Sequence, residues 1–249
     1  MSTFALRTFY NAAQSARENS SFSPSAGKPA VVLAALADEP FMGVVSDRRP
    51  LTVDELALAH DRRHVEAILR GAYDAAMGFC TFNGLMIAAI MLHRDGAARR
   101  IGIVDLDVHY GNGTDDIIRR VGIDYVTHLS FGDVRSGRAA GRRALPDQTV
   151  VDGEADPWIA ALAVELERRF TGMDILFYQA GADPHVNDPL GGALSTEQMK
   201  LRDRRVFRFA RAAGIPVVWN LAGGYQRPLQ RVIDLHVTTV QECRDAWSR

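Results

Sequence analysis

Apolar runs of strand length alternate with longer segments of helical periodicity along most of this chain. The strand-like runs are rich in Ile, Val, Leu and aromatic residues, and each passes directly into a polar or glycine-rich end. They are IGIVDLDVH (101–109), DYVTHLSF (124–131), DILFYQAGAD (174–183) and IPVVWNLAGG (215–224). Continuous apolar strands that alternate with helices are typical of a parallel sheet that is covered on both faces.

Segments with helical spacing lie between these runs, and they predict the helices that cover the sheet. They are residues 81–100, 157–170 and 195–214, followed by a last helix in RPLQRVIDLHVTTVQECRDAW (227–247). Ser195 and Gln198 have the spacing of a capping box, and Gly214 predicts the end of that helix. We therefore predict the α/β class, with residues 1–249 as a single-domain parallel sheet that has helices on both faces. The stretch SSFSPSAGKPA (20–30) is expected to be a loop.

The composition is that of an ordinary globular protein and leaves this interpretation unchanged. The chain has 249 residues, of which 47% are hydrophobic and 24% are charged, and this length can bury a sizeable core. Lys and Arg total 29 against 30 Asp and Glu, so the net charge of -1 favours no nucleic-acid partner. The arginines of VRSGRAAGRR (134–143) are expected on a solvated loop, with a substrate or partner contact as the alternative.

The two cysteines and the start of the chain predict the cellular compartment of the protein. Cys80 and Cys243 lack metal-type spacing, which favours a reducing cytoplasm over a disulfide framework. We expect no signal peptide, and no stretch is long and apolar enough to span a membrane. Nothing in the sequence determines the oligomeric state, so a homo-oligomer stays open.

The segment DLDVHYGNG (105–113) places ionisable residues in what the pattern predicts to be a buried strand. Asp105, Asp107 and His109 occupy every second position and would share one face. A buried carboxylate must find a cation or accept a proton, and a divalent metal would satisfy several such groups at once. Asp183 ends another predicted strand, and ligands of parallel sheets collect at that edge.

Asp107, His109 and Asp183 are therefore candidate ligands, because three protein ligands with an open position are typical of catalytic zinc. An exposed strand facing water is the alternative. Asp105 would orient a neighbouring group or help to bind a second, harder cation. His185 is expected either behind the ligands or at the surface. Iron and cobalt stay open as alternatives to zinc, because they accept the same ligand types.

In four segments the sequence resembles the histone deacetylase superfamily of arginase-like zinc amidohydrolases. In family order, these segments are GFCTFNG (78–84), DLDVHYGNGTDD (105–116), YQAGADPHVNDPLGG (178–192) and LAGGYQ (221–226). The chain is more similar to bacterial acetylpolyamine or acetyl-lysine amidohydrolases than to eukaryotic nuclear enzymes. The resemblance implies an arginase/deacetylase-like fold and the removal of acetyl or other acyl groups from lysine-like or polyamine amines.

By position, the resemblance assigns one Zn²⁺ to Asp107, His109 and Asp183. It makes Tyr225 the catalytic residue that hydrogen-bonds the substrate carbonyl and the oxyanion. It also implies a K⁺ site, a substrate channel and outer positions around the zinc. The K⁺ site comprises Asp105, Asp107, the His109 carbonyl, Ser130 and the Phe131 carbonyl; the substrate residues are Gly78, Phe79, Gly223 and Gly224; the outer positions are Asp105 and Asn112. Simple packing is the alternative role for Tyr225 and Phe79.

The adjacent histidine pair of the family has no counterpart in this chain. HVEAILRGAYDAAMGFCTFNG (64–84) joins two segments that several dozen residues separate in the family, and the joint lies between Gly71 and Ala72. The chain is either a naturally shortened member or lacks a loop. We favour the missing loop, because the joint falls at a loop position and the metal motifs are intact. His60, His64 and His93 are not expected to replace the pair.

Two functions other than a deacetylase remain open. Without a positioned acid–base pair, turnover should fall by about 10²–10⁴. A non-catalytic protein of the same fold that binds a metal or an acyl ligand is therefore the alternative to a deacetylase. A two-manganese ureohydrolase is a weaker third possibility, because DLDVHYGNG has the deacetylase order of ligands.

Overall fold

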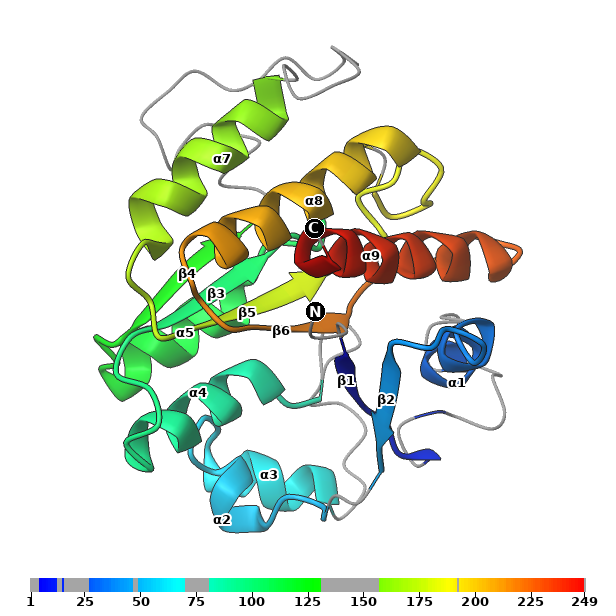
Figure 1. Ribbon diagram of the computed structural model, residues 1–249. Coiled ribbons are helices and arrows are strands. Elements are labelled where there is room, and N and C mark those ends of the chain that lie inside the picture. The colour runs from blue at the N-terminus through cyan, green and yellow to red at the C-terminus, as the bar shows by residue number, and fades with distance from the viewer. Residues whose placement is uncertain are drawn as a thin grey trace.

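The main sheet of the computed structural model has four parallel strands, and a second sheet has two (Figure 1). The strands are β1 (Leu6–Phe9), β2 (Met42–Val45), β3 (Ile101–Asp105), β4 (Val126–Ser130), β5 (Ile175–Ala180) and β6 (Val217–Leu221). The main sheet has the order β4-β3-β5-β6, and β1 pairs with β2. The structure describes residues 5–12, 15, 27–46, 49–69, 81–130, 157–191 and 193–248.

Helices cover both faces of the main sheet (Figure 1). The helices are α1 (Lys28–Ala35), α2 (Val53–Leu56), α3 (Arg62–Leu69), α4 (Gly84–Arg94), α5 (Asn112–Val121), α7 (Pro157–Phe170), α8 (Thr196–Ala212) and α9 (Gln230–Ser248). In Figure 1, α7, α8 and α9 lie on one face of the sheet, and α4 and α5 lie on the other. Helix α1 packs beside α9, next to the two-stranded sheet.

Alternate side chains of β3 enter two separate cores, and for this reason all five residues of the strand are buried. Ile101 and Ile103 belong to the cluster that includes Met86 of α4. Val104 belongs to the cluster that includes Leu162 of α7. A strand covered on both faces needs apolar side chains at both parities. The predicted parallel α/β fold is confirmed.

The predicted strands and helices are present, most of them with shorter bounds, whereas α7 has the predicted bounds. The difference that matters for the site lies at residues 101–109, where β3 ends at Asp105 and the chain then bends through Asp107 and His109. The predicted loop 20–30 is wrong at its end, because α1 begins at Lys28 with a proline in its first turn, where the missing N–H is tolerated. That the whole chain is one domain stays a prediction. Among the described residues, no helix has the length and apolarity needed to cross a bilayer.

The predicted capping box at the start of α8 is formed. Ser195 Oγ accepts a hydrogen bond from the Gln198 amide at 3.2 Å, and Gln198 Oε1 accepts one from the Ser195 amide at 2.8 Å. We expect Ser195→Ala to lower the free energy of unfolding by about 1 kcal/mol, because the amides of the first turn lose an acceptor. Urea denaturation measures this change. Ser195→Asp keeps an acceptor and should cost less, and equal stability of all three proteins would contradict the prediction.

Candidate metal centre

Three ionisable side chains converge at the carboxyl edge of the main sheet. Asp107 and His109 come from the bend after β3, and Asp183 comes from the turn after β5. Because β3 and β5 are parallel neighbours, both segments leave the sheet at the same edge. Each of the three residues offers one ligand atom, and these atoms lie within 4.8 Å of one another. The structure thus brings together the three residues that the sequence analysis proposed as ligands.

The spacing of the ligand atoms suits a small divalent ion. His109 Nδ1 lies 3.2 Å from Asp107 Oδ1 and 3.1 Å from Asp183 Oδ2. Ligand atoms at about 2.0–2.2 Å from a tetrahedral zinc lie about 3.3 Å apart, so the donor set fits this metal. The Asp107 and Asp183 side chains are 12% and 0% exposed, whereas the His109 side chain is 55% exposed. The open side therefore leaves room for a water or a substrate atom.

Backbone amides hold the two carboxylates in place. Asp107 Oδ2 accepts a hydrogen bond from the Gly223 amide at 2.8 Å, and Asp183 Oδ1 accepts one from the Val108 amide at 3.1 Å. A Cβ atom on Gly223 would lie 2.5 Å from Asp107 Oδ2 and closer still to Asp183 Oδ2. Only glycine leaves the space between the carboxylates free.

In the protein alone, protons compensate the charges of this cluster. Burial and then the charge of Asp107 raise the pKa of Asp183 to about 7. The hydrogen bond with Asp107 raises the pKa of His109 to about 9. Burial acts to raise the pKa of Asp107, but the hydrogen bonds from His109, Asp183 and the Gly223 amide together keep that pKa below its ordinary value. A metal would have to displace these protons in order to bind.

Asp105 lies buried beside these residues and supports the bend. Its Oδ1 accepts a hydrogen bond from the Asp107 amide at 3.2 Å, as expected for the orienting role. Burial and then the charge of Asp107 raise the pKa of Asp105 well above its ordinary value. Ser130 pairs with Asp105 across the sheet, and its Oγ accepts a hydrogen bond from the Gly111 amide at 3.3 Å. Phe131 lies outside the described residues, so the K⁺ site stays a prediction.

Tyr225 approaches the cluster from the loop after β6. The centroid of its ring lies 6.5 Å from that of His109, and the two rings meet edge-on at 84°. The Tyr225 amide donates a hydrogen bond to Asp188 Oδ2 at 2.7 Å, which anchors this loop. Gly224 has a φ of 150°, and a Cβ there would lie 2.6 Å from Val232 Cγ1 on α9. The glycine therefore lets the tyrosine loop pack closely against α9.

The remaining predicted site residues lie apart from this cluster or outside the described residues. Asn112 is exposed at the start of α5. His185 is buried, and its Nε2 lies 2.9 Å from Thr196 Oγ1, so the surface alternative is wrong and the residue supports the start of α8. Gly78, Phe79, Cys80 and residues 134–143 lie outside the described residues. Cys243 is a free, buried thiol, and burial raises its pKa to about 12.

The sequence analysis missed a buried charged pair on α8. Arg202 and Asp203 are each only 1% exposed. Arg202 follows Met199 by three residues and precedes Val206 by four, so it lies on the apolar stripe of the helix. A charged pair on such a stripe is the signal that could have revealed it.

The comparisons with known proteins agree with this geometry. Residues 70–131 match the model of the histone deacetylase domain. Acetylpolyamine amidohydrolase 1 of Pseudomonas aeruginosa is 30% identical over 164 residues, which cover 59% of this chain and 45% of that protein. The chain is thus similar in sequence to the histone deacetylase superfamily, as the sequence analysis expected.

Two further comparisons concern the sequence and the fold. An uncharacterized protein of Picosynechococcus sp. is 34% identical over 177 residues, which cover 68% of this chain and 57% of that protein. The crystal structure of the HDA15 HD domain superposes with a TM-score of 0.62 at 20% identity, and the match covers 88% of this chain and 81% of that one. At this identity the likeness shows the fold alone. The chain spans about half the length of the curated relatives that it matches.

The close approach of Gly223 to both carboxylates yields a direct test. We expect Gly223→Ala to weaken zinc binding by about 10- to 100-fold, because the new methyl group would push the carboxylates apart. Competition with a chelator measures the affinity. Gly113→Ala is the control, because a Cβ there meets no atom within 4 Å. Unchanged affinity in Gly223→Ala would show that the two carboxylates do not share one ion.

Zinc affinity should also rise with pH between about 6 and 9. His109, with a pKa of about 9, is protonated through most of this range, and Asp183, with a pKa of about 7, is protonated in its lower part. The metal must displace these protons, so affinity should gain about tenfold per pH unit above pH 7 and more below it. Chelator competition at constant ionic strength measures this. An affinity independent of pH would contradict the proton displacement.

Proposed function

We propose that this protein is a zinc-dependent amidohydrolase that removes acetyl or other acyl groups from lysine-like or polyamine amines. The observation that carries the proposal is the convergence of Asp107, His109 and Asp183, with the Tyr225 ring edge-on to that of His109. The names of the relatives support the reaction class, since they include a histone deacetylase of Arabidopsis thaliana and an acetylpolyamine amidohydrolase.

The chemistry follows from the side chains at this edge of the sheet. A zinc ion in the site would supply a Lewis acid for the amide carbonyl and for a bound water. Asp107 and Asp183 would hold it from the buried side, and His109 through Nδ1. The phenol of Tyr225 would donate a hydrogen bond to the substrate carbonyl oxygen and stabilise the negative charge that develops on it.

The described chain supplies no evident general base beside this site. The other six histidines contact residues that do not belong to the metal cluster. Asn83 N–H donates to His60, Phe82 lies beside His64, and Tyr125 stacks on His93. Asp115 pairs with His128, Thr196 contacts His185, and His236 is fully buried on α9. A positioned base contributes about 10²–10⁴ in rate. We therefore infer metal and acyl-ligand binding with slow turnover for this chain.

The same observation supports a second candidate, a non-catalytic protein that binds a metal and an acyl ligand. A two-manganese site has less support. Among the described residues, one group of three His, Cys, Asp or Glu side chains has the spacing of metal ligands, and it leaves no second set of ligands for another ion.

Zinc content, ligand binding and hydrolysis test the proposal together. We expect one zinc per chain and zinc-dependent binding of an alkyl hydroxamate, which imitates the hydrated amide. Tyr225→Phe should weaken this binding by about fivefold, or about 1 kcal/mol, because one hydrogen bond is lost. Metal analysis and calorimetry give these values, and His109→Ala serves as the control that loses the metal.

Release of acetate from acetyl-lysine and acetylated polyamines separates the two candidates. Zinc-dependent release, even if slow, supports the deacetylase. Tight hydroxamate binding without any release supports the non-catalytic protein. A wild-type chain that binds neither zinc nor hydroxamate would overturn both.

A further inference from the structure

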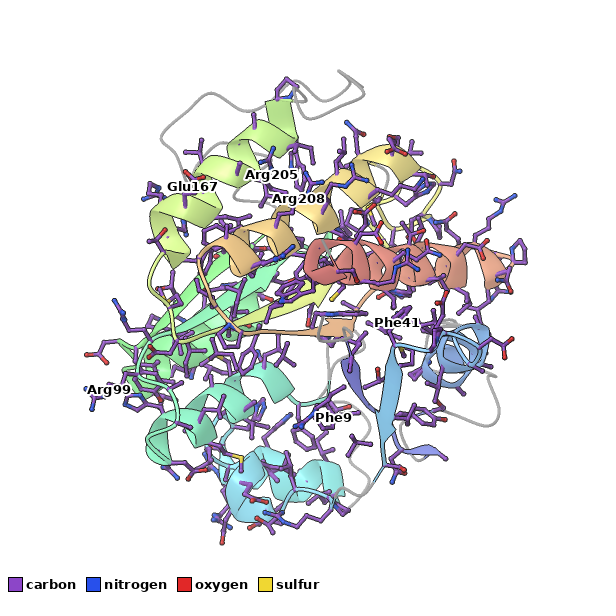
Figure 2. All side chains as sticks on the ribbon, in the orientation of Figure 1. Phe9, Phe41, Arg99, Glu167, Arg205 and Arg208 are labelled. Atoms are coloured by element: carbon purple, nitrogen blue, oxygen red, sulfur yellow. The ribbon has the colours of Figure 1, made fainter. Side chains whose placement is uncertain are left out.

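Arg202 is the bulkiest of the fully buried side chains that the structure describes, with 1% of its surface exposed. Two other arginines of the same helix are labelled in Figure 2: Arg205 is half-buried and Arg208 is exposed. A buried guanidinium is stable only where it is paired and hydrogen-bonded. The hydrogen bonds and the ion pair of Arg202 therefore explain how its charge is accommodated in the core.

One nitrogen of this guanidinium joins the two segments that carry the metal ligands. Arg202 Nη1 donates hydrogen bonds to the Leu106 carbonyl at 3.1 Å and to the Gly181 carbonyl at 2.7 Å. Leu106 directly precedes Asp107, and Gly181 lies two residues before Asp183. The paired residues of β3 and β5 end at Asp105 and Gln179. Beyond that point Arg202 bridges the two chain segments.

The other side of the guanidinium pairs with Asp203, which side chains of β5 and α9 hold in turn. Asp203 Oδ1 accepts a hydrogen bond from Arg202 Nε at 2.8 Å and forms an ion pair with Nη2 at 2.7 Å. Tyr178 of β5 also donates its hydroxyl proton to Asp203 Oδ1, and Thr239 of α9 donates to Oδ2 at 2.6 Å. Asp203 neutralises the arginine, so the pair can lie near a cation without strongly repelling it. A network of this kind leaves the guanidinium little freedom to move.

We propose that Arg202 is a positioning residue for the metal centre, and that it sets the separation of Asp107 and Asp183 by holding the carbonyls next to them. The proposal rests on the proposed function in one respect only, namely that these carboxylates bind a common metal ion. Lysine cannot take this role, because its ammonium group is a point charge without the planar fork that reaches Asp203 and both carbonyls.

Zinc affinity measured beside stability tests the role of Arg202. We expect Arg202→Lys to weaken zinc binding by about 10- to 100-fold in chelator competition, as outer-sphere changes commonly do. The visible spectrum of the cobalt-substituted protein should shift as well, because the ligand geometry changes. A general loss of stability would not by itself produce this shift.

Two matched variants serve as controls. Tyr178→Phe removes a hydrogen bond from Asp203 but leaves the bonds from Arg202 to both carbonyls, so its zinc affinity should stay within about threefold of wild type. Arg208→Lys makes the same chemical change on the exposed side of α8 and should alter neither affinity nor spectrum. Urea denaturation of each metal-free protein shows whether lost affinity merely follows lost stability.

Asp203→Asn is the second variant, in case Arg202→Lys does not fold. It keeps Arg202 but weakens the anchor of the guanidinium, and it should reduce zinc affinity more than Tyr178→Phe does. If wild type binds zinc and each folded variant binds it equally well, the positioning role is refuted and the proposed function stands. If wild type binds no zinc, both proposals are overturned.

Discussion

Two buried carboxylates that face one imidazole are the constraint on which this structure depends. Asp107 and Asp183 are buried from water at the edge of the sheet, and their negative charges repel each other unless a cation or protons compensate them. Amides of Val108 and Gly223 each satisfy one carboxylate oxygen, and the other oxygen of each residue lies beside His109. The arrangement leaves a place for positive charge at the point that is open to solvent.

The order of the strands explains how this place is built. β3, β5 and β6 are parallel neighbours, so the segments after them meet at one edge and bring together the proposed ligands, the glycine loop and Tyr225. Arg202 links the segments after β3 and β5 to α8, and through Asp203 to α9. The fold provides rigid supports, whereas the chemistry depends on a few side chains at the strand ends.

Metal binding and proton transfer depend on different parts of this chain. The proposed ligands come from strand ends in the sheet, which has a buried apolar cluster on each face. The histidine pair expected from the family would come from the region around Gly71, where this chain has several dozen residues fewer than the family. A chain can therefore keep the geometry that binds a metal while it lacks the groups that move protons. For this reason ligand binding has more support from the side chains present than turnover has.

The sequence by itself determined the parallel α/β architecture, the capping box of α8 and which three ionisable residues converge, because each rests on local periodicity or on strand ends. It did not predict β1 or β2, since four residues are too few for a periodic signal. Only the tertiary structure decided that β3 ends before Asp107, that Gly223 closes on both carboxylates and that Arg202 bridges the segments that carry them. These features depend on contacts between segments far apart in the chain, which periodicity along one segment does not record.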